Sequence, residues 1–157
     1  ALDFGVPKKT IIKTIPKIKF EGRVQYLSKG KLKKLLKPNE KLLIDGCHSI
    51  ASAKNLYNYL KTLKEPIYGI WGMQKNKLPE IFIKSFKNIF REVVVLTIPN
   101  EPNAIKAEKL IFIAQKYIPA DRAPNIQAAL KKISSKEKKT IVIFGSLYLV
   151  GDVLNKN

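Results

Sequence analysis

The chain has 157 residues, 45% of them hydrophobic and 27% charged, which is typical of one globular domain with a single core and excludes a disordered chain. Its one cysteine, Cys47, excludes a disulfide framework, and one cysteine with one histidine cannot make a zinc site of these ligands. No apolar run reaches the roughly 18 residues that a membrane span needs. We therefore expect a cytoplasmic domain with no membrane partner.

The formal net charge of +18 comes from 30 basic and 12 acidic residues and suggests a nucleic-acid partner. However, proteins that read phosphates or bases rely on the planar fork of arginine, and all but three of the basic residues here are lysines. The lysines are spread along the chain and form no basic stripe studded with aromatic residues. We interpret them as a solvated surface with weak, salt-dependent adhesion, and expect no specific nucleic-acid partner.

Residues 1–20 contain Pro7 and Pro16 and show no helical period between Lys8 and Lys19, so a linker is expected there, followed by one domain over residues 21–157. Residues 22–27 alternate in polarity as a strand does. From residue 41 onward, short uncharged runs of strand type alternate with amphipathic stretches of helical period. Strands are expected over residues 41–45, 66–72, 93–98 and 140–144, and helices over 53–63, 78–90, 107–117, 126–133 (capped by Asn125) and 147–154.

This alternation predicts an α/β fold, namely a three-layer, Rossmann-like domain in which a mostly parallel sheet is covered by helices on both faces. The ligands of such sheets meet the carboxyl ends of the strands. The segments that follow Ile44, Ile70, Ile98 and Phe144 are therefore the expected ligand-binding edge.

The first candidate site is Asp45-Gly46-Cys47-His48-Ser49, which lies between a buried strand and a helix. A carboxylate and the only imidazole, three residues apart at such a turn, can both face a ligand. The hydroxyls of Ser49 and Ser52 and the helix N-terminus add donors for an anion. The alternative is that Asp45 and Ser49 only cap the helix while His48 lies on a surface loop.

The second candidate site is Gly145-Ser146-Leu147-Tyr148, again between a strand and a helix. Glycine permits a tight turn, after which Ser146 is expected to expose its hydroxyl and N–H at the helix start. The alternative is a serine that only caps the helix. The chain has neither a Gly-x-x-x-x-Gly-Lys-Ser/Thr loop nor a Gly-x-Gly-x-x-Gly loop, so other groups would have to hold the phosphates of a nucleotide.

Four segments occur in an order that matches a known family. They are residues 22–25 (Gly-Arg-Val-Gln), 42–49 (Leu-Leu-Ile-Asp-Gly-Cys-His-Ser), 72–73 (Gly-Met) with Lys77, and 145–153 (Gly-Ser-Leu-Tyr-Leu-Val-Gly-Asp-Val). Together they resemble the C-terminal domain of folylpolyglutamate synthase/dihydrofolate synthase, the folate branch of the Mur-ligase-like enzymes. The resemblance covers residues 20–157, and the lysine-rich stretch between Arg23 and Asp45 is similar to an insertion in alphaproteobacterial members.

The chain departs from the family pattern at several positions. Ser49 and Ile50 stand where the family has Asn-Pro, so the contact of that asparagine is lost. Leu78 replaces the acid that follows Lys77, which removes an ion-pairing role for this lysine. Three further departures are Phe20-Glu21 for Trp-Pro, Cys47 for alanine, which is a small buried residue in either case, and Asp152 for glutamate.

The resemblance implies the C-terminal half of a monomeric ATP-dependent ligase that joins L-glutamate to folate or dihydropteroate through an acyl phosphate. It implies that ATP and Mg²⁺ are bound mainly by an N-terminal domain with a Walker-type loop, and that this chain alone is inactive. By position, Arg23 and Asp45 would contact the nucleotide, while His48 and Ser146 would bind the glutamate. The resemblance leaves open whether the enzyme makes dihydrofolate, polyglutamates or both.

Two other functions are compatible with the same residues. One is a stand-alone basic module that binds nucleotides or nucleic acid without catalysis. The other is a Mur-type ligase domain that takes a different amino acid. Steep weakening by salt would indicate the first, whereas the Gly-Ser-Leu-Tyr segment favours a folate enzyme over the second.

Overall fold

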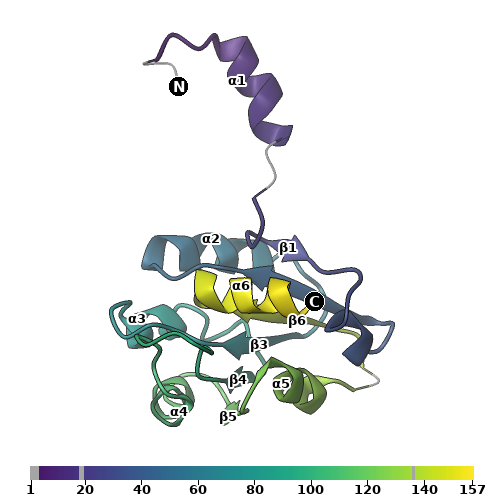
Figure 1. The fold of residues 1–157 in the computed structure, drawn as a ribbon, viewed down its shortest axis with the longest axis vertical. Coiled ribbons are helices and arrows are strands. Elements are labelled where there is room, and N and C mark those ends of the chain that lie inside the picture. Colours follow the sequence, from purple (N-terminus) through teal and green to yellow (C-terminus); the bar gives the residue numbers. More distant parts are fainter. Residues whose placement is uncertain (1–3, 18–19, 136) are drawn as a thin grey trace.

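A computed structural model describes residues 4–17, 20–135 and 137–157 (Figure 1). Its centre is a six-stranded sheet with the strand order β1-β2-β6-β3-β4-β5. All neighbouring strands run parallel except β1, which pairs antiparallel with β2 at one edge. The strands are β1 (Gln25–Tyr26), β2 (Glu40–Asp45), β3 (Ile67–Trp71), β4 (Val93–Val95), β5 (Ala120–Arg122) and β6 (Lys139–Phe144).

Helices cover both faces of this sheet, as Figure 1 shows. On one face, α2, α3 and α4 contribute buried residues to the same hydrophobic cluster. On the other face, α5 and α6 do so, together with Leu32 and Leu36, which flank the short helix η3. The predicted three-layer α/β architecture is therefore confirmed. The helices are α1 (Lys8–Thr14), η2 (Ile15–Lys17), η3 (Lys33–Leu35), α2 (Ile50–Leu60), α3 (Pro79–Lys84), α4 (Ala107–Gln115), α5 (Ile126–Ile133) and α6 (Leu147–Lys156).

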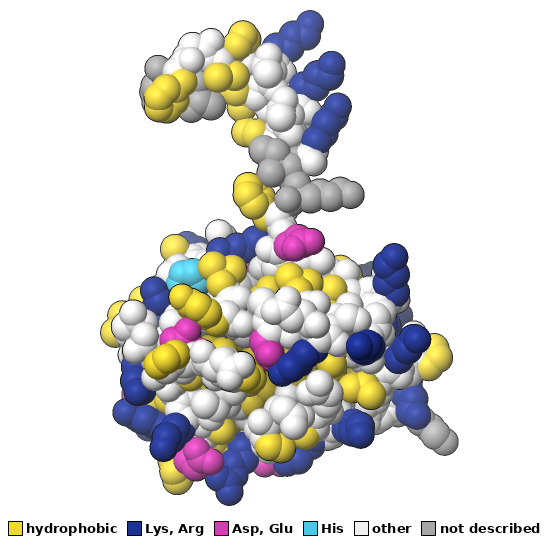
Figure 2. Space-filling model, viewed as in Figure 1, with side chains coloured by type: hydrophobic (Ala, Val, Ile, Leu, Met, Phe, Trp, Pro, Cys, Tyr) yellow, Lys and Arg dark blue, Asp and Glu magenta, His cyan; other side chains and the backbone are white. Residues whose placement is uncertain are grey.

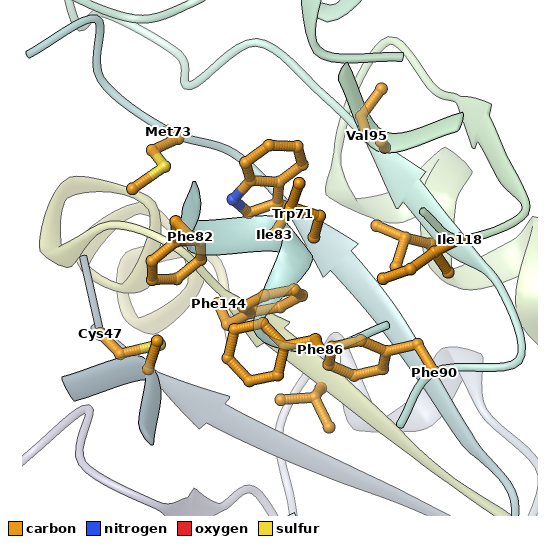
Figure 3. Packing of buried hydrophobic residues seen from close by; sticks show 14 of the residues in the cluster. Cys47, Trp71, Met73, Phe82, Ile83, Phe86, Phe90, Val95, Ile118 and Phe144 are labelled. Carbon is orange, nitrogen blue, oxygen red and sulfur yellow. The ribbon is translucent and has the colours of Figure 1, made fainter. Parts of the chain in front are cut away.

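The two clusters follow from the alternation of side chains along fully buried strands. In β6, Val142 and Phe144 belong to the cluster under α2, α3 and α4, whereas Ile141 and Ile143 belong to the opposite one. Phe144 lies among the rings of α3 and the turn after it, 5.2 Å from the centroid of Phe86 (Figure 3). This packing fixes the carboxyl end of β6 against α3 and the turn after it.

Most predicted elements are present, but their ends differ. The helix expected over residues 78–90 ends at Lys84 and continues as turns, and the strand expected over 93–98 ends at Val95. Strand β5 was not predicted. Asn125 caps α5 as expected, because its side-chain oxygen accepts a hydrogen bond from the N–H of Ala128 at 2.8 Å.

Within the predicted linker, no sequence pattern indicated the helix α1, which occupies residues Lys8–Thr14. Pro7 directly precedes the helix, where no N–H is needed, so it starts the helix rather than breaking it. No residue of α1 is buried, which explains why the sequence carries no apolar period there. In Figure 1, α1 lies away from the sheet and its covering helices. Residues 1–3, 18 and 19 of the predicted linker lie outside the described residues.

The lysine-rich stretch between β1 and β2 packs onto the domain by its leucines. Leu32 and Leu36 are buried in the cluster under α5 and α6, while most lysines around them are exposed. The side chain of Asn157 ties the stretch down, accepting from Leu32 N–H at 3.2 Å and donating to the carbonyl of Lys29 at 2.9 Å. Figure 2 shows basic side chains scattered over the visible face rather than gathered into one stripe, in line with a solvated lysine surface.

Candidate functional site

The carboxyl ends of β2, β6 and β3 lie side by side in the middle of the sheet. Asp45 of β2 pairs with Phe144 of β6, and β6 is followed at once by Gly145. A Cβ atom on Gly145 would lie 2.5 Å from the carbonyl oxygen of Gly72 and 2.5 Å from Cδ1 of Trp71, and its φ is +107°. Only glycine fits this close approach, which brings the segments after β6 and β3 together.

Asp45 is almost completely buried at the end of β2, with 5% of its surface exposed. Its Oδ1 accepts a hydrogen bond from the N–H of Cys47, and its Oδ2 accepts one from the N–H of Val24, both at 2.8 Å. One carboxylate therefore ties the turn that carries His48 to the segment that carries Arg23. Asp45 does not cap α2, so that part of the alternative interpretation is wrong.

Arg23 is exposed beside this carboxylate. The backbone of Val24 lies in the left-handed region, with φ 45°, which is costly for a β-branched residue. The hydrogen bond from its N–H to Asp45 and the one from Gly46 N–H to the carbonyl of Gly22 (2.7 Å) hold this segment in place. The structure thus holds the segment that carries Arg23 against Asp45, and the contact of either residue with a nucleotide stays a prediction.

His48 is half-buried and has a defined ring orientation. Its Nδ1 lies 2.9 Å from the carbonyl oxygen of Gly46, and since a carbonyl can only accept, this contact requires the proton on Nδ1. Within the described part of the chain, Nε2 has no hydrogen-bond partner. A neutral imidazole held in this way presents Nε2 as an acceptor.

Ser49 caps α2, as the alternative interpretation expected. Its hydroxyl accepts from the N–H of Ser52 at 3.2 Å, and the hydroxyl of Ser52 accepts in return from the N–H of Ser49 at 3.0 Å. This reciprocal capping box satisfies two backbone N–H groups at the start of α2.

Ser146 caps α6, and its hydroxyl is not exposed as we expected. The residue is 1% exposed, and its Oγ accepts from the N–H of Tyr148 at 3.1 Å. The extended backbone of a helix N-cap turns the side chain back onto the first turn. The exposed side chains at this strand end are instead those of Leu147 and Tyr148.

A cavity of about 370 Å³ lies where these strand ends meet. Residues that follow β2, β3, β4 and β6 all contribute to it, so the edge predicted from the sequence is the edge that carries the cavity. Its charged or titratable groups are a lysine, a histidine and a tyrosine, and no carboxylate lines it. Such a surface suits an anionic ligand. The lining residues are His48, Gln74, Asn76, Lys77, Asn103, Leu147 and Tyr148.

The sequence did not single out Gln74, Asn76 or Asn103 as site residues. Asn103 reaches the cavity because the loop after β4 is fastened to the loop after β3. The N–H of Lys75 donates to the carbonyl of Asn103 at 2.9 Å, and the N–H of Ile105 donates to the carbonyl of Met73 at 2.8 Å. The only signal in the sequence was that these residues follow two of the predicted strand ends.

Cys47 lies close to these groups but is fully buried. Burial, followed by the nearby charge of Asp45, raises the pKa of its thiol well above the ordinary value. The thiolate is the reactive form of cysteine, so the structure gives this residue a packing role.

The part of the chain that the structure describes contains no group of three or more His, Cys, Asp or Glu side chains placed to hold a metal ion. None of its helices combines the length with the apolar character of a membrane span.

The mostly parallel sheet, covered by helices on both faces and with a cavity at its carboxyl edge, defines a Rossmann-like α/β domain. The family model for the C-terminal domain of dihydrofolate synthetase matches residues 28–156. The chain therefore belongs to this family, and the resemblance seen in its motifs is confirmed. None of the curated proteins matches the sequence.

Solved structures give the same fold. The folylpolyglutamate synthase of Mycobacterium tuberculosis, complexed with ADP and AMPPCP, superposes with a TM-score of 0.78 at 20% identity over 98% of this chain and 36% of that chain. Escherichia coli FolC in complex with DHPP and ADP gives 0.75 at 18% identity, over 96% and 34%. The folylpolyglutamate synthase of Thermotoga maritima gives 0.71 at 28% identity, over 96% and 34%. The chain thus spans about a third of the length of these proteins.

Proposed function

We propose that this chain is the C-terminal domain of an ATP-dependent ligase that adds L-glutamate to folate or dihydropteroate through an acyl phosphate. Membership of the dihydrofolate synthetase family over residues 28–156 supports the reaction class. The observation that carries the proposal is the cavity at the carboxyl edge, where Lys77, His48 and three carboxamides face a space without any carboxylate.

Glutamate presents two carboxylates and an amine, and the cavity offers complementary groups. The ammonium of Lys77 and the carboxamide N–H groups of Gln74, Asn76 and Asn103 can donate to carboxylate oxygens. Nε2 of His48 can accept a hydrogen bond from the amine, because the proton of the neutral ring is held on Nδ1 by the Gly46 carbonyl. The amine must be unprotonated to attack an acyl phosphate, and the free lone pair of Nε2 can take up the proton that the amine loses in that attack.

Ser146 belongs to the glutamate site through the helix it caps. Its buried hydroxyl accepts from the N–H of Tyr148, and this contact sets the start of α6. Leu147 and Tyr148, the first residues of that helix, line the cavity. We propose this indirect contribution in place of an exposed hydroxyl.

The nucleotide is proposed to lie on the β1 side of the same edge. Arg23 is exposed there and can bind a phosphate or stack on a ring. The carboxylate of Asp45 has about four acceptor positions, of which the N–H groups of Val24 and Cys47 occupy two. Since only 5% of Asp45 is exposed, the proposed contact with ribose hydroxyls uses the small part of its carboxylate that solvent reaches.

The phosphates of ATP and the Mg²⁺ are proposed to be bound by an N-terminal domain, to which residues 1–20 lead. The share of 34–36% of the solved chains that this chain covers leaves room for such a domain. Since acyl-phosphate formation needs that domain, we expect residues 1–157 alone to be inactive. We propose the cytoplasm as the compartment and a monomer as the active form.

The test is ATP-dependent ligation of labelled glutamate by the complete enzyme. We expect His48→Ala and Lys77→Met each to raise the KM for glutamate by about tenfold or more, as for a lost charged or oriented contact. Lys75→Met, which removes an exposed lysine outside the cavity lining, is the matched control. Unchanged rate and KM in His48→Ala would refute the assignment. Faster ligation of another amino acid would favour the Mur-type alternative.

A further inference from the structure

The hydroxyl of Ser52, in the first turn of α2, holds the backbone of His48. Ser52 Oγ accepts a hydrogen bond from the N–H of His48 at 3.2 Å and one from the N–H of Ser49 at 3.0 Å, and it lies 3.0 Å from the carbonyl oxygen of Ser49, to which it donates. Both lone pairs of this oxygen are therefore engaged by the turn that carries the imidazole.

The turn between β2 and α2 is held from two sides. Asp45 Oδ1 holds the N–H of Cys47 at 2.8 Å from the end of β2, and Ser52 holds the next N–H, that of His48, from the start of α2. With consecutive peptide groups held in this way, the His48 ring reaches back to the carbonyl of Gly46 at 2.9 Å. Because the ring extends from the backbone that Ser52 holds, a shift of that backbone would move Nδ1 relative to the Gly46 carbonyl.

We propose that Ser52 is a positioning residue for His48, keeping the imidazole proton on Nδ1 and Nε2 directed into the cavity. The identity of the ligand that Nε2 meets rests on the function proposed above, whereas the orientation of the ring does not.

Ser49 provides a matched control for Ser52. Ser49→Ala removes the hydroxyl that accepts from the N–H of Ser52, so it weakens the cap of α2. It also removes the 2.9 Å contact between the two serine hydroxyls, but Ser52 Oγ still accepts from the N–H of His48. Ser52→Ala removes that acceptor, and Ser52→Thr retains a hydroxyl. Comparing Ser49→Ala with Ser52→Ala therefore separates the effect of a weaker α2 cap from the effect of losing the acceptor for the His48 N–H.

The first experiment measures the ¹⁵N chemical shifts of the imidazole in the 157-residue chain, at a pH where the ring is neutral. His48 is the only histidine, so its signals need no assignment. We expect the Nδ1–H form to predominate in the wild type, Ser49→Ala and Ser52→Thr. In Ser52→Ala we expect the ratio of the two tautomers to shift by about fivefold. An unshifted ratio in Ser52→Ala, or an equal shift in Ser49→Ala, would overturn the proposal.

The second experiment measures glutamate kinetics in the complete enzyme. Ser52→Ala is expected to raise the KM for glutamate about fivefold with little change in kcat, and Ser52→Thr is expected to restore it. A wild-type enzyme that does not ligate glutamate would refute the proposed function, while the tautomer ratio would still decide the role of Ser52. A shifted tautomer with an unchanged KM would overturn the link between ring orientation and glutamate binding.

Discussion

Replacing Asp45 by asparagine removes one acceptor from a buried carboxylate that holds two backbone N–H groups. Oδ1 accepts from Cys47 and Oδ2 from Val24, both at 2.8 Å. In Asp45→Asn, one of these positions becomes an NH₂ group whose protons face a backbone N–H. Losing a hydrogen bond to a charged acceptor costs about 1.5–3 kcal/mol, and an unpartnered buried N–H costs about 1–3 kcal/mol. We therefore expect the free energy of unfolding to fall by about 3 kcal/mol.

Denaturant unfolding of the 157-residue chain measures this change directly, and it corresponds to a decrease of roughly 6–12 °C in Tm. The control is Asp121→Asn on β5, which alters an exposed carboxylate paired with Lys132. A surface pair of this kind contributes about 1 kcal/mol or less. If Asp45→Asn were as stable as Asp121→Asn, the carboxylate would not be what holds the two segments together.

Other substitutions and conditions give equally direct tests. Gly30→Ala should destabilise the fold strongly, because Gly30 has φ +111° and a Cβ there would lie 2.2 Å from the Asn157 side chain. Gly151→Ala should not, because a Cβ at Gly151 would have no atom within 4 Å. Equal melting temperatures of the two variants would contradict this. The hydrogen bond from Lys41 lowers the pKa of Glu65 from 4.5 to about 2, so its ionised form stabilises the fold above pH 4.5 and this contribution is lost as the pH falls towards 2. Glu65→Gln should therefore weaken the pH dependence of stability in that range, as acid titration of the unfolding midpoint would show. The buried Cys47 thiol should react with a thiol reagent only as the chain unfolds, and modification at the rate of a free thiol would refute its burial.

The central part of the fold was predictable because it follows from simple burial. Strands β3 and β4, residues 42–44 of β2 and residues 140–144 of β6 are uncharged, and almost all of these residues are buried, so these runs stand out from the lysine-rich remainder. Strand β5 was not predicted because it is a three-residue edge strand that contains two charged residues, Asp121 and Arg122. Helix α1 was not predicted because none of its residues is buried, and an apolar period arises only where one face of a helix packs against the core.

The site was predictable only as far as strand ends and local motifs determine it. Asp45 and His48 follow a buried strand directly, and the sheet places them without help from distant residues. Gln74 and Asn103 come together through hydrogen bonds between two loops that are separate in sequence, which no local pattern records. For Ser146, the sequence located the residue at the helix start but not the direction of its side chain, since exposure and capping use the same amino acid.

The position of β6 has a consequence for the order in which the chain folds. Strands β2 and β3 do not pair with each other, and both pair with β6, which lies between them. During synthesis, residues 40–45 and 67–71 therefore remain unpaired with β6 until residues 139–144 have been made. Until then, two strands with apolar centres keep open edges, which are prone to pairing between molecules. The many exposed lysines, by keeping nascent chains apart through their like charge, would be of most use during that interval.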